Sequence, residues 1–430
     1  MAMIVQHFRS LLSNLSPYNK VEYGIFILFS IGFAIDIWHG GLYAMNLLAV
    51  WGIIKLLWSK QVGNPALNKW GKIVMISMLL YYGYCLLSFL WTENFFYAKI
   101  NLSYRRSFLI LPLYFLLCDT SYLKEIHIKT ILYTFSIAFC IRFYLLLLKA
   151  IFSIFFLHES IACLFGASFD TQHHTFLALF TAFGFTFLVT ELFSNSKFLS
   201  KKTILFLAIS LECYTFLIQS RIGIICIILC LILPGLYQII KKGWHLSTLK
   251  SLLILLLVLG TLKFSFKDIP QANRLGDSLQ QIENSDYSDV RFYLWDCGIT
   301  TIKQNLPWGC GIGDIGDVFN HNWTHHPKYA QYSQSFGQPH NQILFTLSTY
   351  GIPGIILLGF IFCAPVFQLT GKKINSLSTQ YLLYLIIIYS AIGLVDALFN
   401  WTIGCVLFCF FYCIFWSSSN DLSFNLAKRK

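Results

Sequence analysis

Long apolar runs separated by short polar links make up most of the chain. A helix needs about 20 consecutive apolar residues to cross a bilayer. By this measure we predict about twelve spans, near residues 21–38, 41–58, 72–91, 104–118, 130–150, 172–193, 203–220, 222–240, 250–266, 340–369, 379–397 and 401–417. The pattern therefore predicts an all-α polytopic membrane protein.

One polar segment, residues 267–339, interrupts this pattern between the ninth and tenth predicted spans. Within it, SDYSDVRFYLWDCGITTIKQN begins with residues that can cap a helix and is followed by Pro307, so we predict a short amphipathic helix there. The predicted divisions are residues 1–266 with spans one to nine, the loop 267–339, and residues 340–430 with the last spans and a tail. Long excursions are usually functional, so we expect the chemistry in this loop.

The composition supports a membrane protein, because 57% of the residues are hydrophobic and only 12% are charged. The net charge of +12 is spread in short lysine clusters between apolar runs, which indicates topology rather than nucleic-acid binding. If the N-terminus is cytoplasmic, about twice as many Lys and Arg fall on the cytoplasmic side as outside. We therefore predict cytoplasmic termini and an external loop. The first twenty residues show no signal-peptide cleavage pattern.

The chain has 13 cysteines, most of them inside apolar runs, where cysteine acts as a small hydrophobic residue. Only Cys163, Cys297 and Cys310 are expected to meet an oxidising compartment. The spacing allows a bridge between Cys297 and Cys310, and free thiols are the alternative.

Two arginines are candidates for anion binding. Arg221, in LIQSRIGII, sits where two apolar runs meet, so an anion is expected to compensate its charge, with Ser220 and Gly223 leaving room. A snorkelling arginine at a hairpin tip is the structural alternative. Arg291 and Trp295 are four residues apart and share a helix face, so a stacked structural pair is the alternative there.

His340 follows Pro339 at the start of the tenth predicted span, which predicts a histidine at a helix N-terminus. The helix dipole disfavours the imidazolium there, and a neutral imidazole is what a general base requires. The alternative is an interfacial histidine hydrogen-bonded to Asn341.

Further basic residues lie near the predicted membrane boundaries. Arg105 and Arg106, at the outer mouth of the fourth span, are expected either to bind lipid phosphate or to snorkel. Arg142 and Lys149 are seven residues apart in the fifth span, and their shared face is expected to look into the bundle or at head groups.

His173 and His174 open the sixth span beside Asp170 and could line an outer-leaflet cavity, with a structural role as the favoured alternative. Asp396, in GLVDALFNW, is predicted to lie in a late span and to position an arginine.

Two patterns suggest a metal or a nucleotide without meeting the requirements. His321, His325, His326 and His340 match neither HExxH nor a zinc-finger spacing, so no metal is predicted. The glycine-rich residues 309–317 follow a helix and a proline rather than a strand. Their glycines are more consistent with tight loop packing, or with backbone amides that face a phosphate.

Three motifs carry a resemblance to a known family. They are SRxG at Arg221, RxxxW at Arg291 and Trp295 followed by PWGCGIGD, and PHNQILFTLSTYGIPG from His340. With the large loop before the tenth span, the chain resembles the O-antigen ligase family, membrane glycosyltransferases that also include Wzy-type O-antigen polymerases. His325, His326 and residues 329–338 depart from any family pattern.

The resemblance implies a GT-C-like enzyme in the bacterial inner membrane. It would transfer a glycan from an undecaprenyl-diphosphate donor to lipid A core on the periplasmic side, without metal, nucleotide or other cofactor. Arg221 and Arg291 would stabilise the diphosphate, His340 would be the base, and direct attack predicts inversion. Asp396 would support the architecture. The predicted substrate-binding residues are Arg105, Arg106, Arg142, His173, His174, Trp295 and Asn341.

Three alternatives stay open. A Wzy-type polymerase would use the same donor and a different acceptor. A lipid-linked oligosaccharide flippase is expected to show half-repeats, and none is visible. A metal-dependent hydrolase would need a carboxylate and histidine ligand set, which the pattern lacks.

Overall fold

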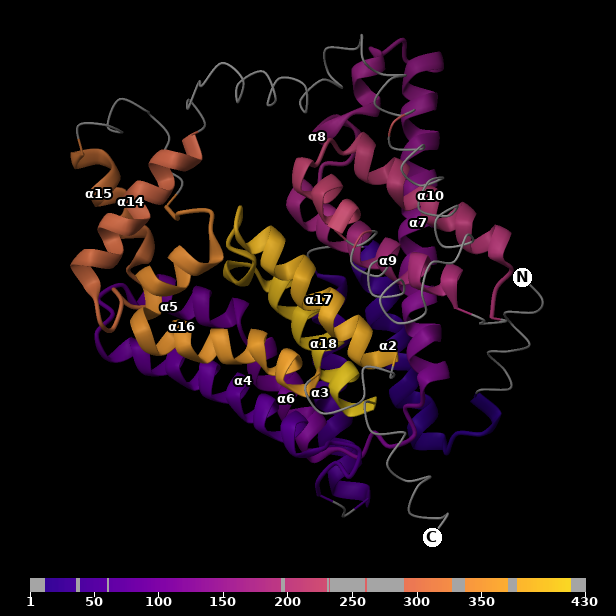
Figure 1. Cartoon of the computed structure of the whole chain (residues 1–430), viewed down its shortest axis with the longest axis horizontal. Coiled ribbons are helices and arrows are strands. Elements are labelled where there is room, and N and C mark those ends of the chain that lie inside the picture. Colours follow the sequence, from indigo (N-terminus) through magenta and orange to yellow (C-terminus); the bar gives the residue numbers. More distant parts are fainter. Residues whose placement is uncertain are drawn as a thin grey trace. The chain divides into compact units, whose positions relative to one another are not determined.

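The computed structural model describes residues 12–35, 39–59, 62–194, 198–229, 290–326, 337–369 and 377–418, with the single positions 232 and 260. These residues form helices joined by links, with no strand among them (Figure 1). The α-helices are α2 (Pro17–Ile35), α3 (Gly40–Ser59), α4 (Lys69–Leu87), α5 (Phe95–Tyr104), α6 (Ser107–Leu117), α7 (Glu125–Phe156), α8 (Gly166–Phe169), α9 (His174–Phe193), α10 (Lys201–Leu217), α14 (Val290–Asn305), α15 (Ile315–His325), α16 (Gln342–Leu369), α17 (Leu377–Gly393) and α18 (Thr402–Ser418). The 3-10 helices are η1 (Ser88–Leu90), η2 (Ile161–Leu164) and η4 (Leu398–Asn400).

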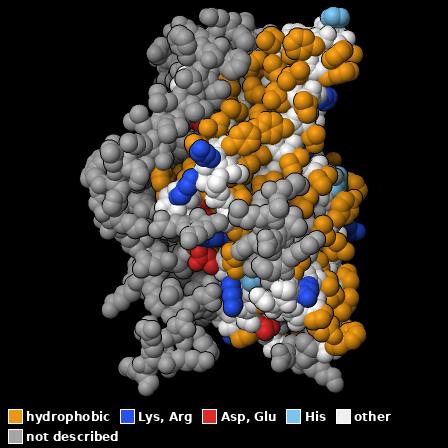
Figure 2. Space-filling model, turned by 90° about the vertical axis from the view of Figure 1, so that its right-hand side faces the viewer, with side chains coloured by type: hydrophobic (Ala, Val, Ile, Leu, Met, Phe, Trp, Pro, Cys, Tyr) orange, Lys and Arg blue, Asp and Glu red, His pale blue; other side chains and the backbone are white. Residues whose placement is uncertain are grey.

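The membrane character of the chain is confirmed. In the described residues, 5 helices are long and apolar enough to cross a bilayer, and they correspond to the predicted second, third, fifth, sixth and tenth spans. Hydrophobic side chains cover much of the described surface on the face shown in Figure 2. Such a surface suits a lipid environment, where helices satisfy their own backbone hydrogen bonds.

The fourth predicted span is wrong as a single helix. Residues 104–118 contain the end of α5 and a separate helix α6 of 11 residues, which is about 16 Å long. That is about half of the hydrocarbon thickness. The total of about twelve spans is not confirmed. The predicted spans 222–240 and 250–266, and the start of the loop 267–339, lie largely outside the described residues.

The chain divides into two compact units. In the first, which includes residues 129–287, α9 packs against α10. In the second, which includes residues 41–128 and 288–430, α4 packs against α6 and α16, and α18 packs against α6 and α17. Helices α9 and α18 are buried along nearly their whole length, each in its own unit. A helix that is apolar all round is expected to take such a central position.

Within the second unit, helix α16 is interrupted in its middle. Gly351 has φ 60° and ψ −153°, which are not helical angles. Pro353 has no N–H, so the carbonyl of Thr349 lacks its usual donor four residues on. The turn also separates the N–H of Ile352 from the carbonyl of Ser348. Three backbone groups of this helix therefore need partners from elsewhere.

The link after α14 supplies these partners. The N–H of Cys310 donates to the carbonyl of residue 348 at 2.9 Å, and that of Gly311 donates to the carbonyl of residue 349 at 3.0 Å. The carbonyl of Pro307 accepts from the N–H of residue 352 at 2.8 Å. A Cβ at Gly309 would lie only 2.5 Å from the backbone of residue 349. The glycine-rich segment is thus a packing element, as one of the two sequence interpretations expected.

Candidate functional site

His340 lies in the link that leads into α16. The predicted place at a helix N-terminus is confirmed with one difference, because Asn341 caps the helix. Its side-chain oxygen accepts from the N–H groups of Ile343 at 2.9 Å and Leu344 at 3.0 Å. His340 itself has φ 45°, in the left-handed region, which costs a non-glycine residue about 1–3 kcal/mol. The surroundings therefore hold the histidine in a conformation that it does not prefer.

Asp396 is the partner of this histidine. Its Oδ1 lies 3.3 Å from Nδ1 of His340, and the side chains are 5% and 25% exposed respectively. The same oxygen accepts from the N–H of Ala397 at 2.8 Å. The prediction that Asp396 lies inside a span is wrong, because it follows α17 in the link to η4. The sequence also predicted an arginine as its partner; the structure shows His340 as a partner, and the arginine stays a prediction.

The link that carries His340 is bound tightly to the link between α17 and α18. The hydrogen bonds are Asn400 Nδ2 to Gln338 Oε1 at 2.8 Å, Asn341 Nδ2 to Leu394 O at 2.9 Å, and Phe399 N to Gln342 Oε1 at 2.8 Å. Asn341 was predicted to bind substrate, but its amide caps one helix and ties it to another link. This geometry favours a positioning role for Asn341.

Arg105 lies at the other end of this hydrogen-bonded network. It is 0% exposed, so neither lipid binding at the surface nor snorkelling describes it. Its guanidinium donates to the carbonyl of Asn101 at 2.6 Å and to the side-chain oxygen of Asn400 at 3.2 Å. It also lies 5.5 Å from the ring centre of Phe345 and 5.6 Å from that of Tyr350, both on α16. Arg105 therefore reaches the His340 link through Asn400.

Sequence reasoning missed this network. Gln338 and Asn400 were not singled out, although Gln338 lies two residues before His340 and Asn400 is a polar residue between two apolar runs. That position was the one available signal for them. Arg106, which was predicted together with Arg105, is only partly buried and precedes α6.

Arg291 and Trp295 lie on α14, which packs against α16. A Cβ at Gly298 would lie 2.9 Å from the Cβ of Pro339, so α14 closely approaches the residue before His340. Arg291 is seven residues before Gly298, on the same helix face and about 10 Å away along the axis. The Trp295 ring contacts Phe292 edge-on at 5.8 Å. The structure thus brings the Arg291 face of α14 toward the His340 link.

Arg221 begins the helical stretch that follows α10, and only residues 218–220 separate the two. The Ser220 hydroxyl accepts from the N–H of Gly223 at 3.2 Å and so caps this stretch. A Cβ at Gly223 would lie 2.7 Å from Thr215 and 3.0 Å from Ala178. The glycine therefore serves helix packing rather than ligand space. Arg221 belongs to the first unit, so its convergence with His340 stays a prediction.

Arg142 is held inside the first unit. Its Nε and Nη2 donate to the two carboxylate oxygens of Asp170, each at 2.9 Å, and Nη1 donates to the carbonyl of Ala34 at 3.0 Å. The Tyr214 hydroxyl donates to the same carboxylate at 2.6 Å. Although burial alone would raise it, these bonds hold the pKa of Asp170 below its usual range. This geometry favours a structural role for Arg142 over the predicted substrate binding.

His173 and His174 stand where the sequence placed them, at the start of α9. Both are exposed, and their rings stack with centroids 4.8 Å apart. Their part in an outer-leaflet cavity stays a prediction.

The histidines of α15 do not form a metal site with other ligands in the described part of the chain. The rings of His321 and His325 lie 4.2 Å apart on one helix face. His326 follows directly after α15.

Cys297 and Cys310 are both free and buried. Their thiols donate to the carbonyls of Phe319 and Gly311 respectively, both at 3.7 Å. Burial raises the pKa of each thiol to about 12. The bridge that the spacing allowed is therefore not formed.

Comparison with known proteins confirms the resemblance drawn from the motifs. Residues 204–359 match the family model described as O-antigen ligase. The matched region contains Arg221, Arg291 and His340, begins after Arg105, and ends before Asp396. No sequence among the curated proteins matches the chain significantly.

Proposed function

We propose that this membrane protein, whose residues 204–359 match the O-antigen ligase family, transfers a glycan from undecaprenyl diphosphate to lipid A core. The reaction would take place on the periplasmic side of the inner membrane, without metal and with inversion at the anomeric carbon. The observation that carries the proposal is the His340–Asp396 pair, in which His340 has a conformation held by its surroundings and lies within the matched residues.

The pair suits a general base. When Nδ1–H of His340 donates to Asp396, the lone pair of the neutral ring is on Nε2. In this proposal Nε2 takes the proton of the acceptor hydroxyl as the oxygen attacks the anomeric carbon. Asp396 then stabilises the imidazolium that forms, as a buried carboxylate does in other acid–base pairs. Attack in one step breaks the bond to the diphosphate and inverts the configuration.

The leaving diphosphate gains negative charge, so cations must stand where that charge develops. Arginine suits this role because its planar fork binds two phosphate oxygens and stays charged when dehydrated. We assign it to Arg291, whose helix face approaches the His340 link, and to Arg221. Trp295, on the same face as Arg291, would shape this part of the loop.

Reconstitution tests the proposal. The purified full chain in liposomes would receive undecaprenyl-diphosphate-linked glycan, with lipid A core in one arm and only a second portion of donor in the other. We expect glycan on lipid A core in the first arm. Elongated donor in the second arm would instead identify a polymerase, and movement of donor across the bilayer without transfer would identify a flippase. A chelator arm tests metal independence, since activity lost with chelator and restored by a divalent ion would contradict it.

A further inference from the structure

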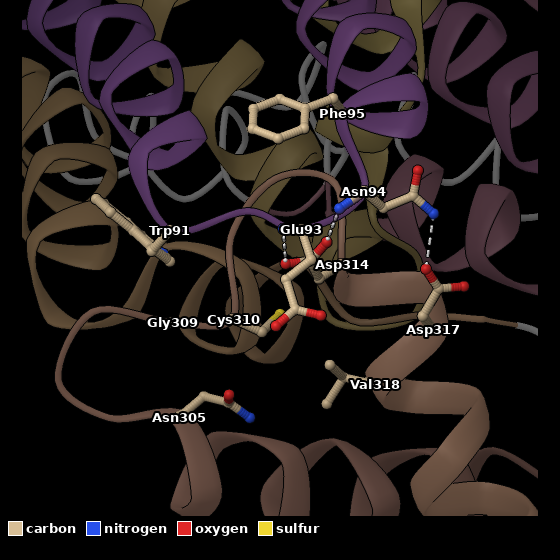
Figure 3. A pocket seen from close by; sticks show the side chains of 10 residues that line it. All are labelled: Trp91, Glu93, Asn94, Phe95, Asn305, Gly309, Cys310, Asp314, Asp317 and Val318. Atoms are coloured by element: carbon tan, nitrogen blue, oxygen red, sulfur yellow. Dashed lines mark hydrogen bonds between the residues drawn. The ribbon is translucent and has the colours of Figure 1, made fainter.

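A pocket of about 770 Å³ lies in the second unit, and its lining contains no residue of the His340 link (Figure 3). One wall is the segment between η1 and α5, and the other is the link between α14 and α15 with the start of α15. Its volume lies within the range of about 300–1,000 Å³ that is usual for small-molecule sites. The residues of the lining that matter below are Trp91, Glu93, Asn94, Asn305, Asp314 and Asp317.

The two walls are joined by hydrogen bonds that Figure 3 shows as dashed lines. The Asp314 carboxylate accepts from the N–H of Glu93 at 2.9 Å and from the N–H of Asn94 at 2.8 Å. The Asn94 amide donates to Asp317 at 2.8 Å. A Cβ at Gly313 would lie 2.2 Å from the carbonyl of Asn94. The pocket is therefore already formed without a ligand, which lowers the cost of binding one.

The lining has acceptors, amides and aromatic rings, but no Lys, Arg or His. Glu93 and Asp317 are exposed, and Asn305 adds an amide. Three carboxylates without a cation repel phosphate, so this pocket does not suit the diphosphate of the donor. No cluster of metal-ligating groups is found in the described residues. The lining is suited instead to hydroxyl and ammonium donors.

Trp91 adds an independent observation. It contributes an aromatic ring to the lining. A sugar suits this combination of groups, because its hydroxyls can donate to the carboxylates while its C–H face covers an aromatic ring.

We propose that this pocket binds a neutral or amine-bearing sugar unit of a glycan substrate. The inference rests on the proposed function for its choice of ligand, and the sugar could belong to the donor glycan or to the acceptor. In either case the pocket binds the glycan, while His340 acts as the base in the transfer reaction.

Direct binding tests the pocket without any transfer reaction. The purified full chain in detergent would be titrated with a glucosamine disaccharide and with cellobiose, both followed by saturation-transfer NMR, and with inorganic phosphate, followed by phosphorus-31 NMR line broadening. We expect both sugars to bind and phosphate not to bind. The double variant Glu93→Gln/Asp317→Asn should weaken sugar binding by about tenfold, because it removes charged acceptors. Glu159→Gln, an exposed carboxylate outside the pocket, is the matched control and should bind like the wild type.

Trp91→Phe keeps an aromatic ring but replaces the indole by a smaller one without an N–H, so it should weaken sugar binding without affecting folding. Sugar binding that is absent in the wild type, or unchanged in both pocket variants, would overturn the inference, as would phosphate binding that these variants abolish.

The transfer assay then separates the two sources of the sugar. In the double variant we expect a KM increase of about tenfold for only one substrate, donor or acceptor, with kcat unchanged. An unchanged KM for both substrates would contradict the inference while leaving the proposed transfer intact. A wild type that binds sugars but transfers nothing would contradict the proposed function and not the pocket.

Discussion

Two arginines in the described residues, one in each unit, have opposite surroundings, and Arg105 is fully buried while the Arg142 side chain is 15% exposed. Arg142 is compensated, because Asp170 binds it through both carboxylate oxygens at 2.9 Å. Arg105 is 0% exposed, and its hydrogen-bond acceptors are only the carbonyl of Asn101 and the amide of Asn400. None of the contacts that the structure gives Arg105 is with a carboxylate.

These different surroundings indicate a structural role for Arg142 and a functional role for Arg105. A buried charge costs free energy unless it is paired, so the Arg142 pair is understandable as part of the packing of the first unit. Arg105 lacks such a pair and is connected through Asn400 to the link that carries His340. Burying the Arg105 charge without a carboxylate costs free energy, which suggests a role that a neutral side chain would not fill. That role would be to position this link and to maintain positive charge near a developing anion.

The largest expected effect is on transfer by His340→Ala, which removes the proposed base. General-base catalysis contributes about 10²–10⁴-fold, so kcat should fall by that factor with the protein still folded. A transfer assay on purified protein with lipid-linked donor measures it. His325→Ala, an exposed histidine of α15, is the matched control and should retain activity. Normal turnover in His340→Ala would remove the base assignment.

The next effect is on stability in the first unit. Arg142→Met leaves the buried Asp170 carboxylate unpaired, which is expected to cost about 3–5 kcal/mol of unfolding free energy. The double variant Arg142→Met/Asp170→Asn removes both charges and should recover much of that loss. Thermal unfolding of detergent-solubilised protein checks both variants. Equal stability of the single and double variants would show that the pair contributes little.

Arg105→Met, unlike Arg142→Met, should lower transfer activity and not stability. Replacing a buried charge that has no carboxylate partner by an apolar side chain is expected to leave stability unchanged or higher. Transfer, however, should fall about tenfold through kcat, because the His340 link loses its anchor at Asn400. In a His340→Ala background the same change should add little, since both act on one step. A large loss of stability with normal kcat would make Arg105 structural, like Arg142.

The sequence predicted the positions of the long helices better than it predicted which residues contact one another. The apolar runs located α16 to within two residues at its start, because length and hydropathy suffice for a long apolar helix. The break between α5 and α6 at Arg105 and Arg106 escaped the same reasoning, since an apolar run does not show where a helix changes direction. Hydropathy also cannot tell a buried arginine from one at the surface.

In the candidate site, too, local features could be predicted and long-range contacts could not. His340 was found because the Pro-His-Asn pattern marks the start of a helix, which is a local property. Its partner Asp396 is 56 residues away, and the pairing depends on how two links pack against each other. Arg105 and Asn400 are 295 residues apart, so no spacing argument could connect them. Predicting these contacts would require the packing of α5, α16, α17 and α18 together.

The smallest expected effect concerns acid stability, and it tests whether Asp170 is charged when paired. The pKa of Asp170 is held below its ordinary value of 3.8 in the folded protein, so its unfolded form binds a proton more readily. Its stabilising contribution is therefore fully present above the ordinary value and is lost as the pH falls through the lower folded value. Comparing melting temperatures of wild type and Asp170→Asn from pH 6 down to about pH 3 should show the wild-type advantage shrinking in acid. Glu159→Gln, an exposed carboxylate, should show no such change relative to the wild type. A difference between wild type and Asp170→Asn that stays constant over this range would mean that Arg142 is held by geometry alone and not by the charge of its partner.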